Sequence, residues 1–153
     1  MPSLDAETAV RAELEAAQAL LDRQAALTRA MGEGQAAPQI EALTRALAAS
    51  IDQASQAARR RAALLADRAA MDGWIASDPA RASARRALIE SGRRIRRAID
   101  REAKSSAYLA RRIALWNETQ RAWIAEAVLR ETRAEGYGPA GRGGLAANLD
   151  KMA

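Results

Sequence analysis

The sequence contains no cysteine and no histidine, and these two absences remove much of the chemistry that side chains perform. Without cysteine the chain has no disulfide, no thiolate metal ligand and no thiol nucleophile. Without histidine it lacks the commonest metal ligand and the commonest general base of enzymes. The sequence also has no Walker A loop, no G-x-G-x-x-G loop, no H-E-x-x-H helix and no nucleophile-elbow serine. We therefore expect no catalytic residue, no metal site and no cofactor, and we expect that the protein is not an enzyme.

Aromatic and β-branched residues are scarce as well. Phe is absent, and aromatic residues make up 3% of the 153 residues. A sheet would lack the side chains that favour strands, whereas the abundant Ala, Leu, Arg, Glu and Gln are strong helix formers. The composition predicts an all-α protein of one domain, with an Ala-lined core that buries little apolar area at each contact.

Long apolar runs are missing too. No stretch approaches the ~20 residues that a membrane-spanning helix needs. The first residues have neither the charged start nor the apolar core of a signal peptide. We expect a cytoplasmic protein without membrane insertion.

Three helices are predicted, at about 4–31, 38–74 and 79–134. Gly32 and Gly34 suit the end of the first helix, Pro38 suits the start of the second, and Pro79 suits the start of the third. Trp74 and Ile75 lie at the corner between the second and third helices, where we expect them to plug the end of a bundle. With short loops, this order predicts an elongated antiparallel three-helix bundle or coiled coil over residues 1–134.

The third predicted helix is longer than its neighbours can cover. It exceeds the second by about 16 residues, or roughly 25 Å, so we expect an overhang that begins near residue 118. This overhang carries four large apolar residues, namely Trp123, Ile124, Val128 and Leu129. An exposed apolar stripe of this kind marks a partner site.

A heptad stripe follows the third helix over residues 88–127, with positions alternately four and three residues apart. Glu102 and Ser106 interrupt its apolar character. The interpretation that we favour is a local turn of the stripe towards Ala103 and Leu109, which leaves Glu102 in solvent. The alternative is a polar layer between helices that sets their register.

The two late tryptophans are assigned different environments. Trp116 is expected to pack in the core near Met31 and Ile40, and Trp123 is expected to contact a partner, because Trp is enriched at binding hot spots. The whole stripe is predicted to accept an amphipathic helix of a partner protein. Its members are Leu109, Ile113, Trp116, Trp123, Ile124, Val128 and Leu129.

The net charge of +5 is unevenly distributed. Residues 1–58 carry four basic and eight acidic side chains, whereas residues 81–130 carry thirteen basic and five acidic ones. The basic half has the charge to bind nucleic acid or an acidic partner. We favour the interpretation that it packs beside the acidic half of the same chain, because Ile95 and Ile99 follow the heptad stripe and the arginine stems flank it.

Glycine dominates the stretch that follows the third helix. Five of the nine residues at 136–144 are glycine, so residues 135–153 are predicted to form a flexible tail. Leu145, Leu149 and Met152 have helical spacing, which predicts a short amphipathic turn at 145–152.

With these helices and this tail, the chain resembles the FlgN family of flagellar type III export chaperones over nearly its whole length. The resemblance rests on the order of a short, a long and a very long helix, on the Tyr-Gly-x-x-Gly pattern at residues 137–141, and on Asn117 among the spaced apolar residues of the third helix. It implies a cytoplasmic chaperone that binds the disordered C-terminal segments of the hook–filament junction proteins FlgK and FlgL and prevents their premature assembly. It also implies delivery of these clients to the export-gate protein FlhA, with Tyr137 taking part in that docking and the late part of the third helix binding the client.

The alternative function is a non-enzymatic structural coiled coil or a basic, nucleic-acid-associated helical protein. We do not expect nucleic acid to be the partner, because the basic stretch at 93–101 lacks aromatic residues and the chain offers no separate recognition helix. Binding to phosphates would weaken steeply with ionic strength, whereas apolar capture would not. Because heptad stripes also pair identical helices, a homodimer stays open.

Overall fold

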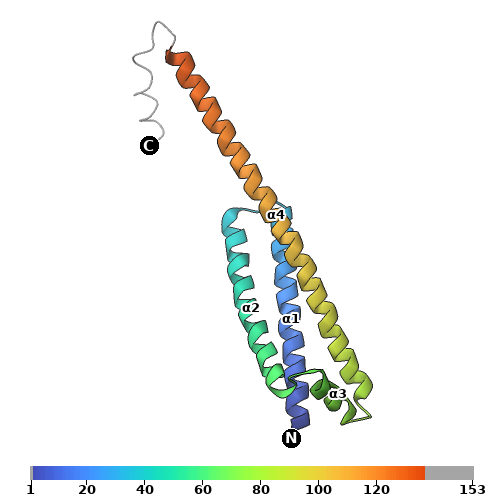
Figure 1. Cartoon of the computed structure of the whole chain (residues 1–153). Coiled ribbons are helices and arrows are strands. Elements are labelled where there is room, and N and C mark those ends of the chain that lie inside the picture. The colour runs from blue at the N-terminus through green and yellow to red at the C-terminus, as the bar shows by residue number, and fades with distance from the viewer. Residues whose placement is uncertain (1, 137–153) are drawn as a thin grey trace. The chain divides into compact units, whose positions relative to one another are not determined.

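The chain folds into helices joined by short turns (Figure 1). The structure is a computed structural model that describes residues 2–136, with the side chains of residues 5–134. The helices are α1 (Pro2–Gly32), α2 (Ala37–Leu64), α3 (Arg68–Ala76) and α4 (Ala82–Gly136), and residues 2–136 contain no strand. The prediction of an all-α protein is confirmed. Residues 137–153, with most of the predicted tail and the turn at 145–152, lie outside the described residues.

The chain divides into two compact units, Met1–Ala110 and Arg111–Ala153. The first unit contains α1, α2, α3 and the first part of α4, and the described part of the second unit is the remainder of α4. Within the first unit, α1 and α2 lie side by side and run in opposite directions (Figure 1).

The predicted break between the first two helices is present. Gly34 has a φ of +67°, a backbone conformation that glycine adopts without steric cost. The Gln35 amide donates to the Ala30 carbonyl at 3.0 Å, which satisfies one of the last carbonyls of α1. Pro38 then lies in the first turn of α2, where its missing N–H costs no helical hydrogen bond.

The prediction of one helix over 38–74 is wrong, because the chain turns at residues 65–67 and forms a fourth helix, α3. Asp67 is the N-cap of α3, and its carboxylate accepts a hydrogen bond from the Ala70 amide at 2.7 Å. Leu65 is buried in the core just before this cap. The turn is favoured because it brings Leu65 and the apolar side of α3 into one cluster, which a continuous helix would separate.

The start of the last helix also differs from the prediction. Pro79 lies in a turn, in which the Arg81 amide donates to the Asp78 carbonyl at 3.1 Å, and α4 begins at Ala82. This turn lets α4 leave α3 in a new direction.

The apolar core of the first unit is small. Its buried members are Ala6, Val10, Leu65, Trp74 and Ile75, and Met71, Ala82, Leu88 and Ile89 pack against them. The prediction that Trp74 and Ile75 plug one end of the helices is confirmed. Much of the rest of α1 and α2 is lined by Ala, so each helix contact there removes little apolar area from water.

Polar contacts join the helices further along α1. Gln24 is 6% exposed, and its amide Nε2 donates to Ser106 Oγ of α4 at 2.8 Å. Thr28 Oγ1 lies 3.5 Å from the Glu102 carbonyl oxygen. Ala103, by contrast, is exposed. The stripe therefore does not turn towards Ala103. Ser106 forms a polar contact between helices through its side chain, and Glu102 contributes its backbone carbonyl.

The α1–α2 contact has a polar element of the same kind. Ser50 of α2 is 1% exposed and accepts a hydrogen bond from Arg23 of α1. The same Arg23 Nη1 also donates to the Ala46 carbonyl at 3.0 Å. Since burial without a partner would be costly for each group, these contacts align α1 with both neighbouring helices.

Candidate functional site

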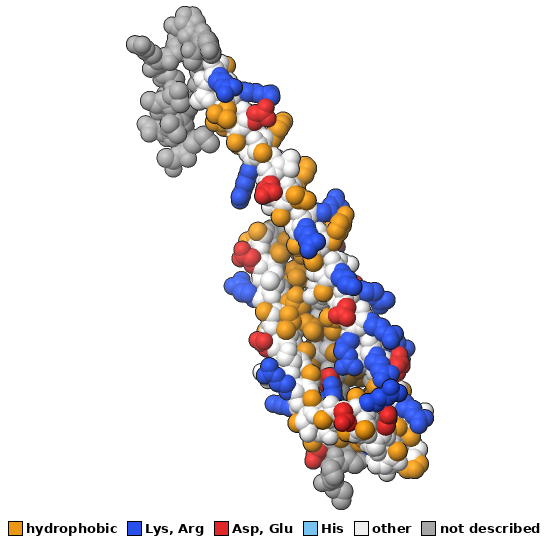
Figure 2. All heavy atoms as spheres, viewed as in Figure 1, with side chains coloured by type: hydrophobic (Ala, Val, Ile, Leu, Met, Phe, Trp, Pro, Cys, Tyr) orange, Lys and Arg blue, Asp and Glu red, His pale blue; other side chains and the backbone are white. Residues whose placement is uncertain are grey.

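Large apolar side chains remain in solvent along the later part of α4. Trp123 is 72% exposed and Trp116 is 64% exposed, and Ile124 and Val128 are each more than half exposed. Figure 2 shows hydrophobic side chains on the surface of this helix. Among residues 111–134, every side chain is exposed except that of Gln120, which is half-buried. Apolar exposure of this extent is typical of surfaces that bind a partner.

Helix geometry sorts these side chains into two faces. With a turn of about 100° per residue, five of them lie within an arc of about 140°. We call this arc the tryptophan face, and it comprises Ile113, Trp116, Trp123, Ile124 and Val128. Leu115 and Leu129 lie on the opposite side of the helix with Ala122 between them. The predicted single stripe is thus divided, because Leu129 does not share a face with the tryptophans.

Two other predicted positions also differ. Leu109 belongs to the first unit and is half-buried, with its Cδ1 4.0 Å from the position that a Cβ on Gly32 would take. The end of α1 therefore takes up part of its surface. The expectation that Trp116 packs in the core near Met31 and Ile40 is wrong, because its side chain is mostly in solvent. Tyr137, the predicted gate-docking residue, lies outside the described residues.

The most buried charge of the described residues lies elsewhere, at the junction of α1, α3 and α4. Arg85 is 1% exposed, and its Nη1 donates to the Trp74 carbonyl at 2.6 Å and to Ser77 Oγ at 3.1 Å. Its guanidinium carbon lies 4.7 Å from the centre of a Trp74 ring, which is cation–π geometry. Its Nη2 is 4.0 Å from the Glu7 carboxylate. Arg85 thus holds the three helices together.

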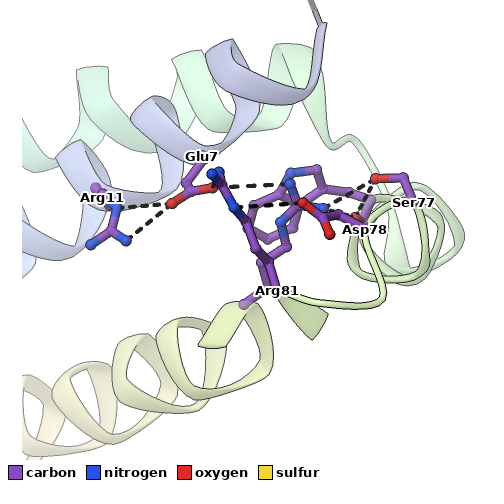
Figure 3. Close-up of polar contacts among 7 residues, drawn as sticks. Glu7, Arg11, Ser77, Asp78 and Arg81 are labelled. Atoms are coloured by element: carbon purple, nitrogen blue, oxygen red, sulfur yellow. Dashed lines mark hydrogen bonds and ion pairs between the residues drawn. The ribbon is translucent and has the colours of Figure 1, made fainter. Parts of the chain in front are cut away.

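Glu7 is surrounded by cations in the same region (Figure 3). It accepts a hydrogen bond from Arg11 Nη2 at 3.0 Å, and Arg81 Nη1 lies 3.4 Å from its other oxygen. The hydrogen bond from Arg11 is the main cause that lowers the pKa of Glu7, followed by the charges of Arg11, Arg81 and Arg85, while burial opposes the shift. The contacts are those of a structural ion-pair network.

The sequence analysis missed Arg85, although a signal was present. The heptad stripe that begins at Leu88 extends back by three residues to Arg85, so the side chain faces the neighbouring helices. Trp74 on the preceding helix offers the aromatic ring and carbonyl that a buried guanidinium needs. A charged residue on an apolar stripe is therefore a candidate for burial when an aromatic residue lies at the adjoining corner.

A cluster of metal-ligating side chains is absent from the described residues. No group of three Asp, Glu, His or Cys side chains within that part of the chain is placed to hold a metal ion. The space between α1 and α4 contains a cavity of about 40 Å³, lined in part by Leu14, Leu88 and Gly92, with Glu13 in ion pairs to Arg61 and Arg96. A cavity of this size has room for water at most.

No helix within residues 2–136 is both long enough and apolar enough to cross a membrane. Comparison with known proteins gave no match among protein-family models, curated proteins or solved structures.

Proposed function

We propose that the protein is a flagellar export chaperone of the FlgN type, whose tryptophan face binds an amphipathic helix from the C-terminal segments of FlgK and FlgL. The observation that carries this proposal is the exposure of Trp116, Trp123, Ile124 and Val128 on one side of α4. An apolar surface costs free energy in water, which a partner helix recovers by covering it.

The chemistry of this face favours a helix as its occupant. Positions 113, 116, 120, 123 and 127 follow the three- and four-residue spacing by which one helix packs into another, and all of them except Gln120 are apolar. Arg112 and Thr119 border one side of this face with polar groups, which suits a partner with a polar edge. A client segment that is disordered before binding must lose conformational entropy, so the complex should be of moderate affinity and releasable.

Release is part of the proposed cycle. Capture of the client in the cytoplasm would prevent its premature assembly, and Tyr137 would dock the loaded chaperone on the export-gate protein FlhA. If the stretch around Tyr137 has the flexibility that its glycine content predicts, Tyr137 would reach a second protein while the client stays bound. The proposal requires no bound nucleotide, metal or cofactor.

Calorimetric titration of the full chain with the C-terminal segments of FlgK and FlgL tests the proposal. We expect saturable 1:1 binding with a negative heat-capacity change and little dependence on salt, because apolar burial drives it. Trp123→Ala should weaken binding by about tenfold or more, since central tryptophans contribute at least ~2 kcal/mol at interfaces.

Two variants control this experiment. Leu115→Ala removes an exposed apolar side chain from the opposite side of the same helix, so it should leave client binding unchanged. Tyr137→Ala should spare client binding and weaken binding to the cytoplasmic domain of FlhA. Equal losses of client affinity in Trp123→Ala and Leu115→Ala would refute the assignment of the tryptophan face. Absence of heat with a folded protein would refute the client.

A further inference from the structure

A row of cations follows the outward side of α4 within the first unit. The basic stripe, as we call it, consists of Arg86, Arg93, Arg94, Arg97, Arg101 and Lys104, and all six side chains are exposed. Helix geometry places them within an arc of about 100°, centred opposite the side of α4 on which Leu88, Ile95 and Ile99 lie. Figure 2 shows Lys and Arg side chains gathered along this helix.

These cations differ from the arginines that face α1. Arg96 forms an ion pair with Glu13 at 3.2 Å, and Arg81 forms one with Glu7 at 3.4 Å. The expectation that the basic half packs beside the acidic half of the chain therefore holds for these inward residues and for Arg85, which pairs with Glu7. Within the basic stripe, Arg93 Nη1 forms an ion pair with the Glu90 carboxylate at 3.7 Å. The other five side chains of the stripe form no ion pair with a carboxylate of the described residues.

Such a stripe is unfavourable for the isolated helix. Arg93, Arg97 and Arg101 follow one another at four-residue spacing, and Lys104 comes three residues later. Like charges at these spacings repel each other and destabilise the helix. Soluble surfaces ordinarily intersperse charges of both signs, whereas the arc of the stripe contains one carboxylate, that of Glu90, with Asp100 at its edge. An opposite charge supplied by a partner would relieve this repulsion.

We propose that the basic stripe is a docking surface for an acidic helical segment of a second protein. The stripe is a nearly straight row about 27 Å long, in which the cations from Arg93 to Lys104 repeat at three- and four-residue spacing, or about 5–6 Å along the axis, and Arg86 lies about 10 Å before them. A second helix with Glu or Asp at three- and four-residue spacing has the same rise and presents carboxylates at the same intervals. Arginine also suits carboxylates, because its planar guanidinium can donate two parallel hydrogen bonds.

Nucleic acid fits the stripe less well. The backbone of a duplex curves around its axis, so a single straight row of cations meets few successive phosphates. Single strands are held partly by stacking of bases on aromatic side chains, and residues 86–104 contain no aromatic residue. The docking surface and the tryptophan face lie in different units and use different chemistry, so this inference does not depend on the proposed export function.

The test measures binding of a labelled, Ala-based helical peptide of about 18 residues, the length of the stripe, by fluorescence anisotropy at low and high salt. One peptide carries its glutamates along one face, and an isomer of the same composition spreads them around the helix. We expect tighter binding of the face-aligned peptide. We expect this binding to weaken with salt.

Two triple variants with the same change in net charge locate the binding site. Arg94→Glu, Arg97→Glu and Arg101→Glu together reverse the centre of the stripe, whereas Arg45→Glu, Arg59→Glu and Arg60→Glu reverse exposed arginines of α2. The stripe variant should lose about tenfold or more in affinity, since several individually weak ion pairs act together, and the α2 variant should lose much less. If the stripe variant does not fold by circular dichroism, Gln at the same three positions replaces Glu.

Several results would overturn the proposal. These are absence of saturable binding by the face-aligned peptide, equal binding of its isomer, and equal losses in the two triple variants. Tighter binding of a DNA duplex of about 20 base pairs than of the peptide, with a steep salt dependence, would assign the stripe to nucleic acid instead.

Discussion

Replacement of Gly92 by Ala should stabilise the protein, although Gly92 lies in the middle of α4 and faces α1. A Cβ at this position would lie 3.8 Å from Leu14 Cδ1, which is ordinary van der Waals contact. The cavity of about 40 Å³ between α1 and α4 adjoins it. Gly34 is the one residue with positive φ among the described residues, so the backbone at Gly92 suits any amino acid.

The magnitude follows from two contributions. Ala is favoured over Gly in a helix interior by about 0.8–1.0 kcal/mol. Complete burial of the added methyl group would contribute about 0.8 kcal/mol more, and a half-buried position such as Gly92 gains a part of that. We expect the free energy of unfolding to rise by about 1–1.5 kcal/mol in total. A domain of about 100 residues would then melt about 4–8 °C higher.

Urea and thermal denaturation followed by circular dichroism measure this effect, and two further glycines provide the comparison. Gly73→Ala in α3 has no atom within 4 Å of the new Cβ, so it should gain about 1 kcal/mol from helix propensity alone. Gly34→Ala should destabilise the protein, because Ala at a φ of +67° is strained. A loss of stability in Gly92→Ala would refute the reasoning, since it would require α1 and α4 to pack more closely than the structure has them.

Three further predictions concern the polar groups of the first unit. Arg85→Ala should lower the free energy of unfolding by about 3 kcal/mol or more, because it leaves the Trp74 carbonyl without this donor and opens a cavity. A loss below about 1 kcal/mol in urea denaturation would contradict the conclusion that Arg85 holds the three helices together. Because the pKa of Glu7 is lowered, its carboxylate adds stability above its ordinary pKa, and this stability is lost as the pH falls through the lowered pKa. Glu7→Gln should therefore flatten the acid limb of a curve of unfolding free energy against pH. An unchanged acid limb would argue against this role of Glu7. Ser106→Ala should lower the free energy of unfolding by about 1 kcal/mol, because it removes a hydrogen-bond partner of the buried Gln24 amide. The double variant with Gln24→Leu should recover part of that loss. Urea denaturation of the two single variants and the double variant measures both effects.

Local sequence signals predicted much of the helical structure. The extent of α1 and most of α4 follow from apolar spacing, and the break at Gly32 and Gly34 follows from the backbone freedom of glycine. The exposure of Trp123 was predicted from helix lengths alone. These features depend on residues close together in the chain, so the sequence carries them directly.

The errors share a different cause. Ala, Arg and Leu around residues 58–69 all favour helix, yet α2 ends at Leu64 and Asp67 caps the start of α3, because a turn there buries Leu65 with Trp74. Trp116 was assigned to the core because its spacing matches the stripe, yet its surface remains in solvent. Periodicity shows which side of a helix is apolar, and it does not show whether another helix covers that side.

By itself, the sequence determined that this protein is helical, lacks the side chains of thiol and imidazole chemistry and carries tryptophans late in a long helix. The tertiary structure alone decided that Arg85 is buried while Arg94 and Arg97 face solvent, and that Gln24 meets Ser106. The reason is physical: helix formation follows from contacts within one turn, whereas burial of a side chain depends on the helix that packs against it.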